Sequence, residues 1–128
     1  MYQDAYQSYQ TVNLGAQTAQ ASPVQLVLIL MDGLLEELAR ARAHIEARRY
    51  ELKARSLDKC IAILNGLSSA LDTEQGGEVV DNLGRLYDFC ADRLCRAGIA
   101  LEPAMVDEVA QVLGTLRQGW QEVQARHG

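Results

Sequence analysis

Histidine is scarce in this chain, and its two positions argue against a metal centre. The 128 residues contain only His44 and His127. A ferritin-like dimetal site on a helical protein would need Glu-x-x-His pairs, but Ala41 and Gln124 stand three residues before the histidines. We therefore expect neither a bound metal nor another cofactor.

Motifs of nucleotide and acyl chemistry are also missing. The sequence has no Gly-rich phosphate loop of the Walker type, no Gly-x-Ser-x-Gly elbow and no cysteine with an evident histidine partner. Neighbouring acidic residues such as Glu36 and Glu37 point about 100° apart on a helix, and we interpret them as solvated charges. These absences favour binding over catalysis, and no catalytic residue is assigned.

Long apolar runs and an excess of positive charge are missing as well. The most apolar segment, residues 26–31, is followed directly by Asp32, so no window approaches the roughly 20 apolar residues of a membrane helix. The first ten residues are polar and tyrosine-rich, unlike a secretory signal. The formal net charge is −5, which disfavours nucleic acid as a partner. We expect a cytoplasmic protein without membrane insertion.

One cluster of basic residues stands out in this chain of negative net charge. Most of it falls at a predicted helix end and turn, where cations offset the carbonyl dipole. We interpret it as a solvated corner of the molecule. The cluster comprises Arg40, Arg42, Arg48, Arg49, Lys53 and Arg55.

The three cysteines indicate a reducing environment. Cys60, Cys90 and Cys95 are odd in number and form no Cys-x-x-Cys pair. The first two fall in apolar helical stripes, where a thiol behaves as a small hydrophobic group. We expect buried, unpaired thiols at these two positions.

Apolar residues recur at steps of three and four along most of the chain, which predicts helices. Ser22 is placed as an N-cap, Pro23 at the first helical position and Gln25 as the partner in a capping box. The first apolar stripe would continue onto arginines, so a turn is expected near Arg49. Gly98 is placed to end the third helix as a C-cap. The predicted helices span about 23–47, 51–72, 78–98 and 103–125.

Four helices joined by short turns predict an all-α fold, an antiparallel up-down four-helix bundle. The length and apolar content suit a single domain over residues 1–128. Residues 1–21 carry one charge and no sustained helical pattern. We expect this segment to be a mobile arm that can dock as a short helix.

The predicted helices carry more apolar surface than a bundle needs. A bundle helix requires one apolar stripe, yet residues 26–31 are apolar in every direction around the first helix. Further apolar residues lie outside the main stripes of the third and fourth helices. Either the arm of the protein itself or a helix from another chain, laid in a groove, would cover this surface.

Several strings resemble those of a known family. Residues 21–27 and 30–33 resemble the Ser-Pro-x-x-Leu and Leu-Tyr-Asp-Gly strings of the flagellar export chaperone FliS family. Residues 71–83 and 86–89 are similar to that family's Gly-Gly-Glu-Ile-Ala-x-Asn-Leu-x-x-Leu-Tyr-Asp-Tyr core. A third match lies within residues 93–120. The resemblance therefore covers nearly the whole chain in order.

The resemblance implies an antiparallel four-helix bundle with a short amino-terminal cap. It also implies a chaperone for the disordered carboxy-terminal segment of flagellin, which wraps round the bundle in hydrophobic grooves. Tyr6 and Tyr9 resemble arm positions implicated in delivery to the export gate. Two positions depart from the family pattern: Met31 replaces the usual aromatic residue, and Gly98 stands where Asn is common.

Our hypothesis from the sequence is a flagellin-specific export chaperone without enzymatic activity, which prevents premature polymerisation of its client. The expected partners are flagellin and a component of the export gate. The alternative is a dimeric helical bundle that associates through the same apolar surface with its arm swapped, and a homodimer is its expected partner. The candidate partner-binding residues are Tyr6, Tyr9, Val27, Ile29, Met31, Val79, Phe89, Met105 and Val112.

Overall fold

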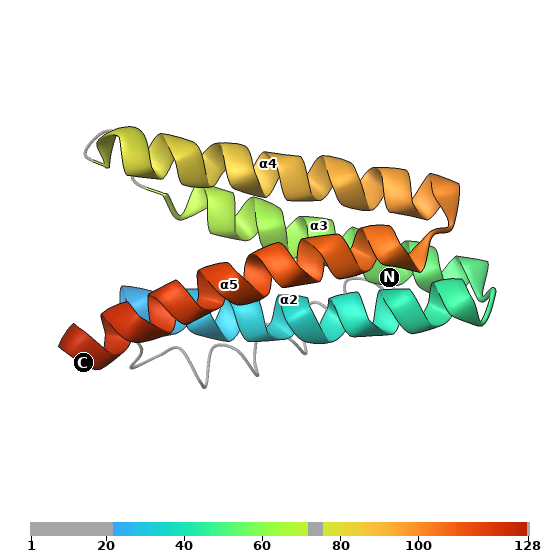
Figure 1. Cartoon of the computed structure of the whole chain (residues 1–128), viewed down its shortest axis with the longest axis horizontal. Coiled ribbons are helices and arrows are strands. Elements are labelled where there is room, and N and C mark those ends of the chain that lie inside the picture. Colours follow the sequence, from blue (N-terminus) through green and yellow to red (C-terminus); the bar gives the residue numbers. More distant parts are fainter. Residues whose placement is uncertain (1–21, 72–75, 128) are drawn as a thin grey trace, which may run out of the picture.

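The computed structural model describes residues 22–71 and 76–127 of the chain. Within these ranges the backbone forms four α-helices and no strand. The helices run alternately in opposite directions (Figure 1), which confirms the predicted all-α antiparallel bundle. The predicted arm, residues 1–21, lies outside the described residues. The helices are α2 (Pro23–Glu46), α3 (Tyr50–Ser69), α4 (Gly77–Ala100) and α5 (Pro103–His127).

The helix α2 begins with the predicted capping box. Ser22 Oγ accepts a hydrogen bond from the Gln25 backbone N–H at 3.2 Å. The Gln25 side chain accepts one from the Ser22 N–H at 2.8 Å. Pro23 occupies the first helical position, where no N–H is needed. These reciprocal bonds satisfy donors that a helix start leaves open, so this short string sets where α2 begins.

The chain turns between α2 and α3 where the apolar stripe meets the arginines, as predicted. Arg48 adopts a left-handed conformation with φ 59°. Its N–H bonds to the Ile45 carbonyl at 3.1 Å, and the Arg49 N–H bonds to the His44 carbonyl at 2.9 Å. This pair of bonds is a Schellman motif, in which glycine usually takes the left-handed position. An arginine there introduces local backbone strain.

The connection between α3 and α4 differs slightly from the prediction. The helix α3 ends at Ser69 instead of residue 72, because Ser68 and Ser69 already weaken helix propensity ahead of the glycine pair. The helix α4 begins at Gly77 with φ 64°. Only glycine adopts that backbone conformation without strain, which explains why it starts the helix here.

The predicted end of the third helix at Gly98 is wrong, because α4 continues to Ala100. Gly98 has a packing role instead: a Cβ at this position would lie 3.0 Å from Leu57 Cδ1 of α3. Lys53 Nζ also donates to the Gly98 carbonyl at 2.9 Å, which places a cation at the carbonyl end of α4. The glycine thus permits the close approach of α3 and α4, and Leu101 at φ 57° ends the helix.

Leu101→Gly is expected to raise the free energy of unfolding by about 1 kcal/mol, because a left-handed backbone brings Cβ too close to the following carbonyl oxygen. Urea denaturation followed by circular dichroism measures the change. Glu102→Gly is the matched control and is expected to bring no gain, since Glu102 has no positive φ to relieve. A loss of stability in Leu101→Gly would show that the leucine side chain matters more than the backbone strain.

The apolar run at the start of α2 is divided between core and surface. Met31 is fully buried, Val27 and Leu30 are half-buried against the core, and Leu26 is 37% exposed. None of the helices in the described ranges is long and apolar enough to cross a membrane. All four helices supply the core, whose largest fully buried side chains are Met31, Leu34, Leu38, Leu64, Leu67, Tyr87, Leu94, Val106, Val109 and Leu113.

Candidate partner-binding groove

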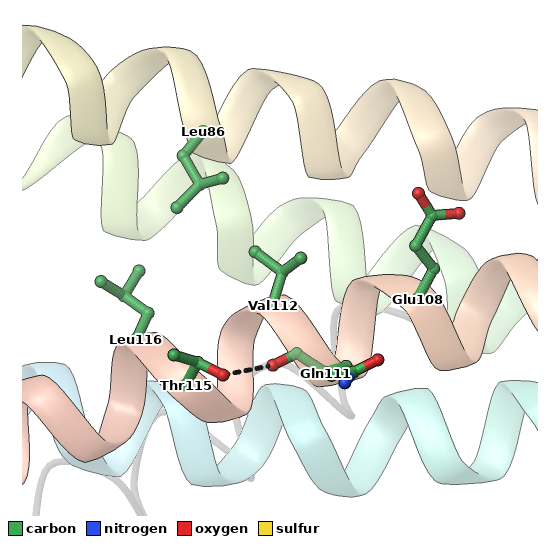
Figure 2. Close-up of a pocket in the computed structure, with 6 residues that line it drawn as sticks. All are labelled: Leu86, Glu108, Gln111, Val112, Thr115 and Leu116. Carbon is green, nitrogen blue, oxygen red and sulfur yellow. Dashed lines mark hydrogen bonds between the residues drawn. The ribbon is translucent and has the colours of Figure 1, made fainter.

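A groove of about 410 Å³ lies between α4 and α5. Figure 2 shows the side chains of Leu86, Val112 and Leu116 pointing into this space from the two helices. An apolar cleft between helices can accept the apolar side chains of an amphipathic helix. The residues that line the groove are Leu86 from α4 and Glu108, Gln111, Val112, Thr115 and Leu116 from α5.

The groove opens because α5 follows α2 more closely than α4. Figure 1 shows α4 and α5 near each other at their connector and separated toward the other end of the bundle. Two ion pairs hold α5 to α2: Arg42 Nε lies 2.6 Å from Asp107 Oδ1, and Arg117 pairs with Asp32. These hydrogen bonds raise the pKa of both guanidinium groups. Such exposed pairs add little stability, but they orient α5 on α2.

The two ends of the groove differ in chemistry. On the side of the α4–α5 connector, Arg93 of α4 donates to Glu108 Oε2 at 3.0 Å and 3.3 Å across the gap. In the other direction, Gly119 lies one turn beyond Thr115 on the same face of α5. Within the part of the chain that the structure describes, no neighbouring heavy atom lies within 4 Å of the place its Cβ would take. The groove therefore has a charged bridge at one end and, as far as the described residues show, open space at the other.

Two exposed apolar residues extend the Leu86 side of α4. Val79 is 70% exposed and Phe89 is 46% exposed. They lie seven residues before and three residues after Leu86, spacings that put all three on one side of the helix. Arg93 continues this side four residues after Phe89 and bonds to α5. The side of α4 that carries these apolar residues is therefore the side that faces α5.

Known proteins match this chain over almost its whole length. The sequence profile of the flagellar protein FliS matches residues 5–127. The chain is 40% identical over 116 residues to the flagellar secretion chaperone FliSB of Pseudomonas aeruginosa, covering 91% of this chain and 92% of that protein. It is 35% identical over 117 residues to the flagellar secretion chaperone FliS of Salmonella typhimurium, covering 91% and 87%. The chain belongs to the FliS family.

A solved structure supports the fold of this FliS family member. A crystal structure of a bacterial flagellar chaperone matches it with a TM-score of 0.78 and 17% identity, over 98% of this chain and 99% of that one. Family membership confirms the prediction of a flagellar secretion chaperone that acts in the cytoplasm and is not an enzyme. Among the residues placed by the structure, no group of three or more His, Cys, Asp and Glu side chains could hold a metal ion.

Three of the predicted partner-binding residues lie at or beside the groove. Val112 lines it, and Val79 and Phe89 extend the Leu86 side of α4. These three positions were predicted because they fall outside the main apolar stripes of their helices. In the structure Val112 lines the groove, whereas Val79 and Phe89 are exposed on the side of α4 that carries Leu86.

The other predicted residues lie elsewhere. Val27 and Met105 are half-buried against the core, and Ile29 is half-buried on α2. The placement of Met31 on the binding surface is corrected, because this residue is 0% exposed. It lies three residues before Leu34 and so belongs to the same buried stripe of α2. Tyr6 and Tyr9 lie outside the described residues.

Most of the groove lining was missed by reasoning from the sequence. The three- and four-residue spacing of apolar residues predicts that Leu86 and Leu116 belong to the core stripes of their helices, yet both are only half-buried. The spacing of apolar residues identifies which side of a helix is apolar. The angle at which two helices cross determines which residues at the border of that apolar side stay uncovered. A signal existed in Val112, which lies off the main stripe and is next to Leu116 on the helix surface.

The three thiols differ in environment, and the burial predicted for Cys60 and Cys90 is confirmed. Burial raises the pKa of Cys60 to about 12, with a further contribution from Glu37. Burial also raises the pKa of Cys90 to about 11. Cys95 is exposed. Because the thiolate is the reactive form, the two buried thiols are protected both sterically and chemically.

We therefore expect one thiol of the folded protein to react rapidly with Ellman's reagent at about pH 8, and three after unfolding in denaturant. Cys95→Ser should abolish the rapid phase, whereas Cys60→Ser should leave it unchanged. Rapid reaction of two or three thiols in the folded protein would contradict this assignment.

Proposed function

We propose that this chaperone binds the disordered carboxy-terminal segment of flagellin and that part of this segment lies as a helix in the groove between α4 and α5. The observation that carries the proposal is the open apolar space into which Leu86, Val112 and Leu116 point. The names of the relatives in Pseudomonas aeruginosa and Salmonella typhimurium, flagellar secretion chaperones, support a secreted flagellar client. Binding would cover the client's apolar helix face and so prevent premature polymerisation.

The charged bridge at one end of the groove gives the bound helix a defined position. Arg93 and Glu108 join the two walls near the connector, so apolar side chains of the client are favoured only on the far side of this bridge. Val79 and Phe89 then extend the contact on α4. At Gly119, which has no side chain, α5 leaves room for the client backbone to approach.

Further contacts complete the proposed client path. Val27, Ile29 and Met105 are proposed as secondary contacts because each is only half-buried, which leaves apolar surface for a client that wraps around the bundle. Tyr6 and Tyr9 are proposed to take part in delivery to the export gate, on the basis of the sequence resemblance. Met31 is left out because it has no exposed surface.

Calorimetric titration with a peptide from the carboxy terminus of flagellin tests this function. A large negative change in heat capacity together with new helicity in circular dichroism is expected, because a disordered segment folds as it buries apolar surface. An unrelated amphipathic peptide of the same length and charge is the control. Absence of binding at roughly micromolar peptide would reject the proposal. Sedimentation of the protein alone then tests whether it forms the alternative homodimer.

A further inference from the structure

One end of the bundle is both apolar and basic. Figure 1 shows the α2–α3 turn and the α4–α5 turn at the same end, opposite the C terminus. At this end Ile99 is 84% exposed, and Tyr50, Leu52 and Leu101 are 49%, 41% and 38% exposed. We name this surface the turn end, defined by Arg48, Arg49, Tyr50, Leu52, Ile99 and Leu101.

The charge of the turn end is opposite to that of the whole protein. Residues 47–55 carry four basic side chains and one acidic side chain, although the net charge of the chain is −5. The acidic one, Glu51, pairs with Arg55 at 2.8 Å. Arg48 and Arg49 are exposed, and within the described part of the chain neither forms an ion pair with a carboxylate. This surface therefore favours an acidic partner.

Two other acidic residues near the turn end do not reverse its charge. Glu46 pairs with Arg42 at 2.7 Å. Glu102 is exposed in the α4–α5 turn. The nearest basic residue along the sequence, Arg96 of α4, pairs with Asp92. Glu102 therefore adds one negative charge beside the four basic side chains of residues 47–55.

The turn end is held in place by specific backbone and side-chain contacts. Arg48 and Leu101 keep left-handed conformations, φ 59° and 57°, that residues with a Cβ adopt at a cost. Lys53 Nζ lies 5.9 Å from the centroid of the Tyr50 ring and donates to the Gly98 carbonyl at 2.9 Å. The start of α3 is thus tied to the last turn of α4, beside Ile99.

We propose that the turn end docks on the surface of an anionic lipid bilayer. The surface is formed by the two turns at one end of the bundle. Its exposed apolar side chains together with its basic side chains match the apolar boundary and the anionic headgroups of such a bilayer. Ile99 and Leu101 enter the boundary between headgroups and acyl chains. Tyr50 lies at the level of the headgroups, and Arg48 and Arg49 attract their negative charge.

Docking in this orientation is compatible with the rest of the molecule. The remainder of the chain is acidic and would face away from the bilayer. The groove lined by Leu86 and Val112 lies along the side of the bundle (Figure 2) and stays uncovered. Because the attraction is partly electrostatic between exposed groups, it is expected to weaken with salt.

Co-sedimentation of the full chain with vesicles tests the proposal. Binding is expected to vesicles of phosphatidylglycerol and phosphatidylcholine at low salt, and not to phosphatidylcholine alone. Arg48→Gln with Arg49→Gln is expected to lower the partition coefficient about 25-fold, or fivefold per basic residue. Arg85→Gln with Arg126→Gln removes the same charge from helical positions away from the turn end and is expected to change binding less than about twofold.

A fluorescence measurement tests the apolar part independently. Ile99→Trp is expected to give a blue shift on addition of anionic vesicles, whereas Phe89→Trp on the side of α4 is not. Absence of binding to anionic vesicles, equal losses in both double variants, or capture by an acidic protein without vesicle binding would each overturn the proposal. No client is present in these experiments, so their outcome does not depend on the function proposed for the groove.

Discussion

Leu86→Asp is expected to weaken binding of the flagellin carboxy-terminal peptide by at least about 100-fold, equivalent to nearly 3 kcal/mol. Leu86 lines the groove from the α4 side, and it is not among the half-buried residues packed against the core. The variant should therefore fold. A carboxylate at this position would be covered by the client, and burying an ionised group without a partner costs several kcal/mol. Calorimetric titration of both proteins measures the change.

Cys95→Asp is the matched control for this variant. Cys95 is exposed and lies nine residues after Leu86, which places it about 180° around the same helix. The same charge on the opposite face of α4 should change affinity less than about twofold. Equal losses in the two variants, or none in Leu86→Asp, would place the client outside the groove.

Met31→Ala is expected to lower the free energy of unfolding by about 2–5 kcal/mol, because truncating a fully buried side chain loses apolar burial and leaves a cavity. Met31 is 0% exposed and belongs to the core. Urea denaturation of the variant and of the unmodified chain gives the difference.

Leu26→Ala provides the comparison on the same helix. Leu26 is 37% exposed, so its truncation should cost less than about 1 kcal/mol. The affinity of Met31→Ala for the flagellin peptide, measured under conditions where this variant is folded, should stay close to that of the unmodified protein. A stable Met31→Ala variant that binds poorly would restore this residue to the binding surface that the sequence predicted.

The number and order of the described helices follow from short-range signals. The Ser22 capping box and Pro103 mark two helix starts, and arginines in place of core residues mark the turn near Arg49. These signals act between residues a few positions apart, so they can be recognised in a sequence. The end of α4 could not be predicted in this way. Gly98 does not end the helix but allows close packing against Leu57 on another helix.

Glu37 illustrates a second limit of the sequence pattern. Its interpretation as a solvated charge is wrong, since it is 3% exposed. Its carboxylate lies 3.5 Å from Arg40 Nη1 and 4.0 Å from Lys59 Nζ of α3, so two cations offset the cost of burial. A residue at the flank of an apolar stripe is covered or exposed according to where the next helix lies, which periodicity does not specify.

The sequence by itself determined the all-helical class, the buried stripes, most of the turns and the family, because periodicity, capping and local motifs depend on neighbouring residues. Only the tertiary structure decided which apolar residues remain available to a partner. The groove lies beside α5 because this helix packs more closely on α2 than on α4. The ion pairs Arg42–Asp107 and Asp32–Arg117, between residues 65 and 85 positions apart, orient α5 there. The same chain with α5 packed tightly on α4 would keep every helix and have no groove.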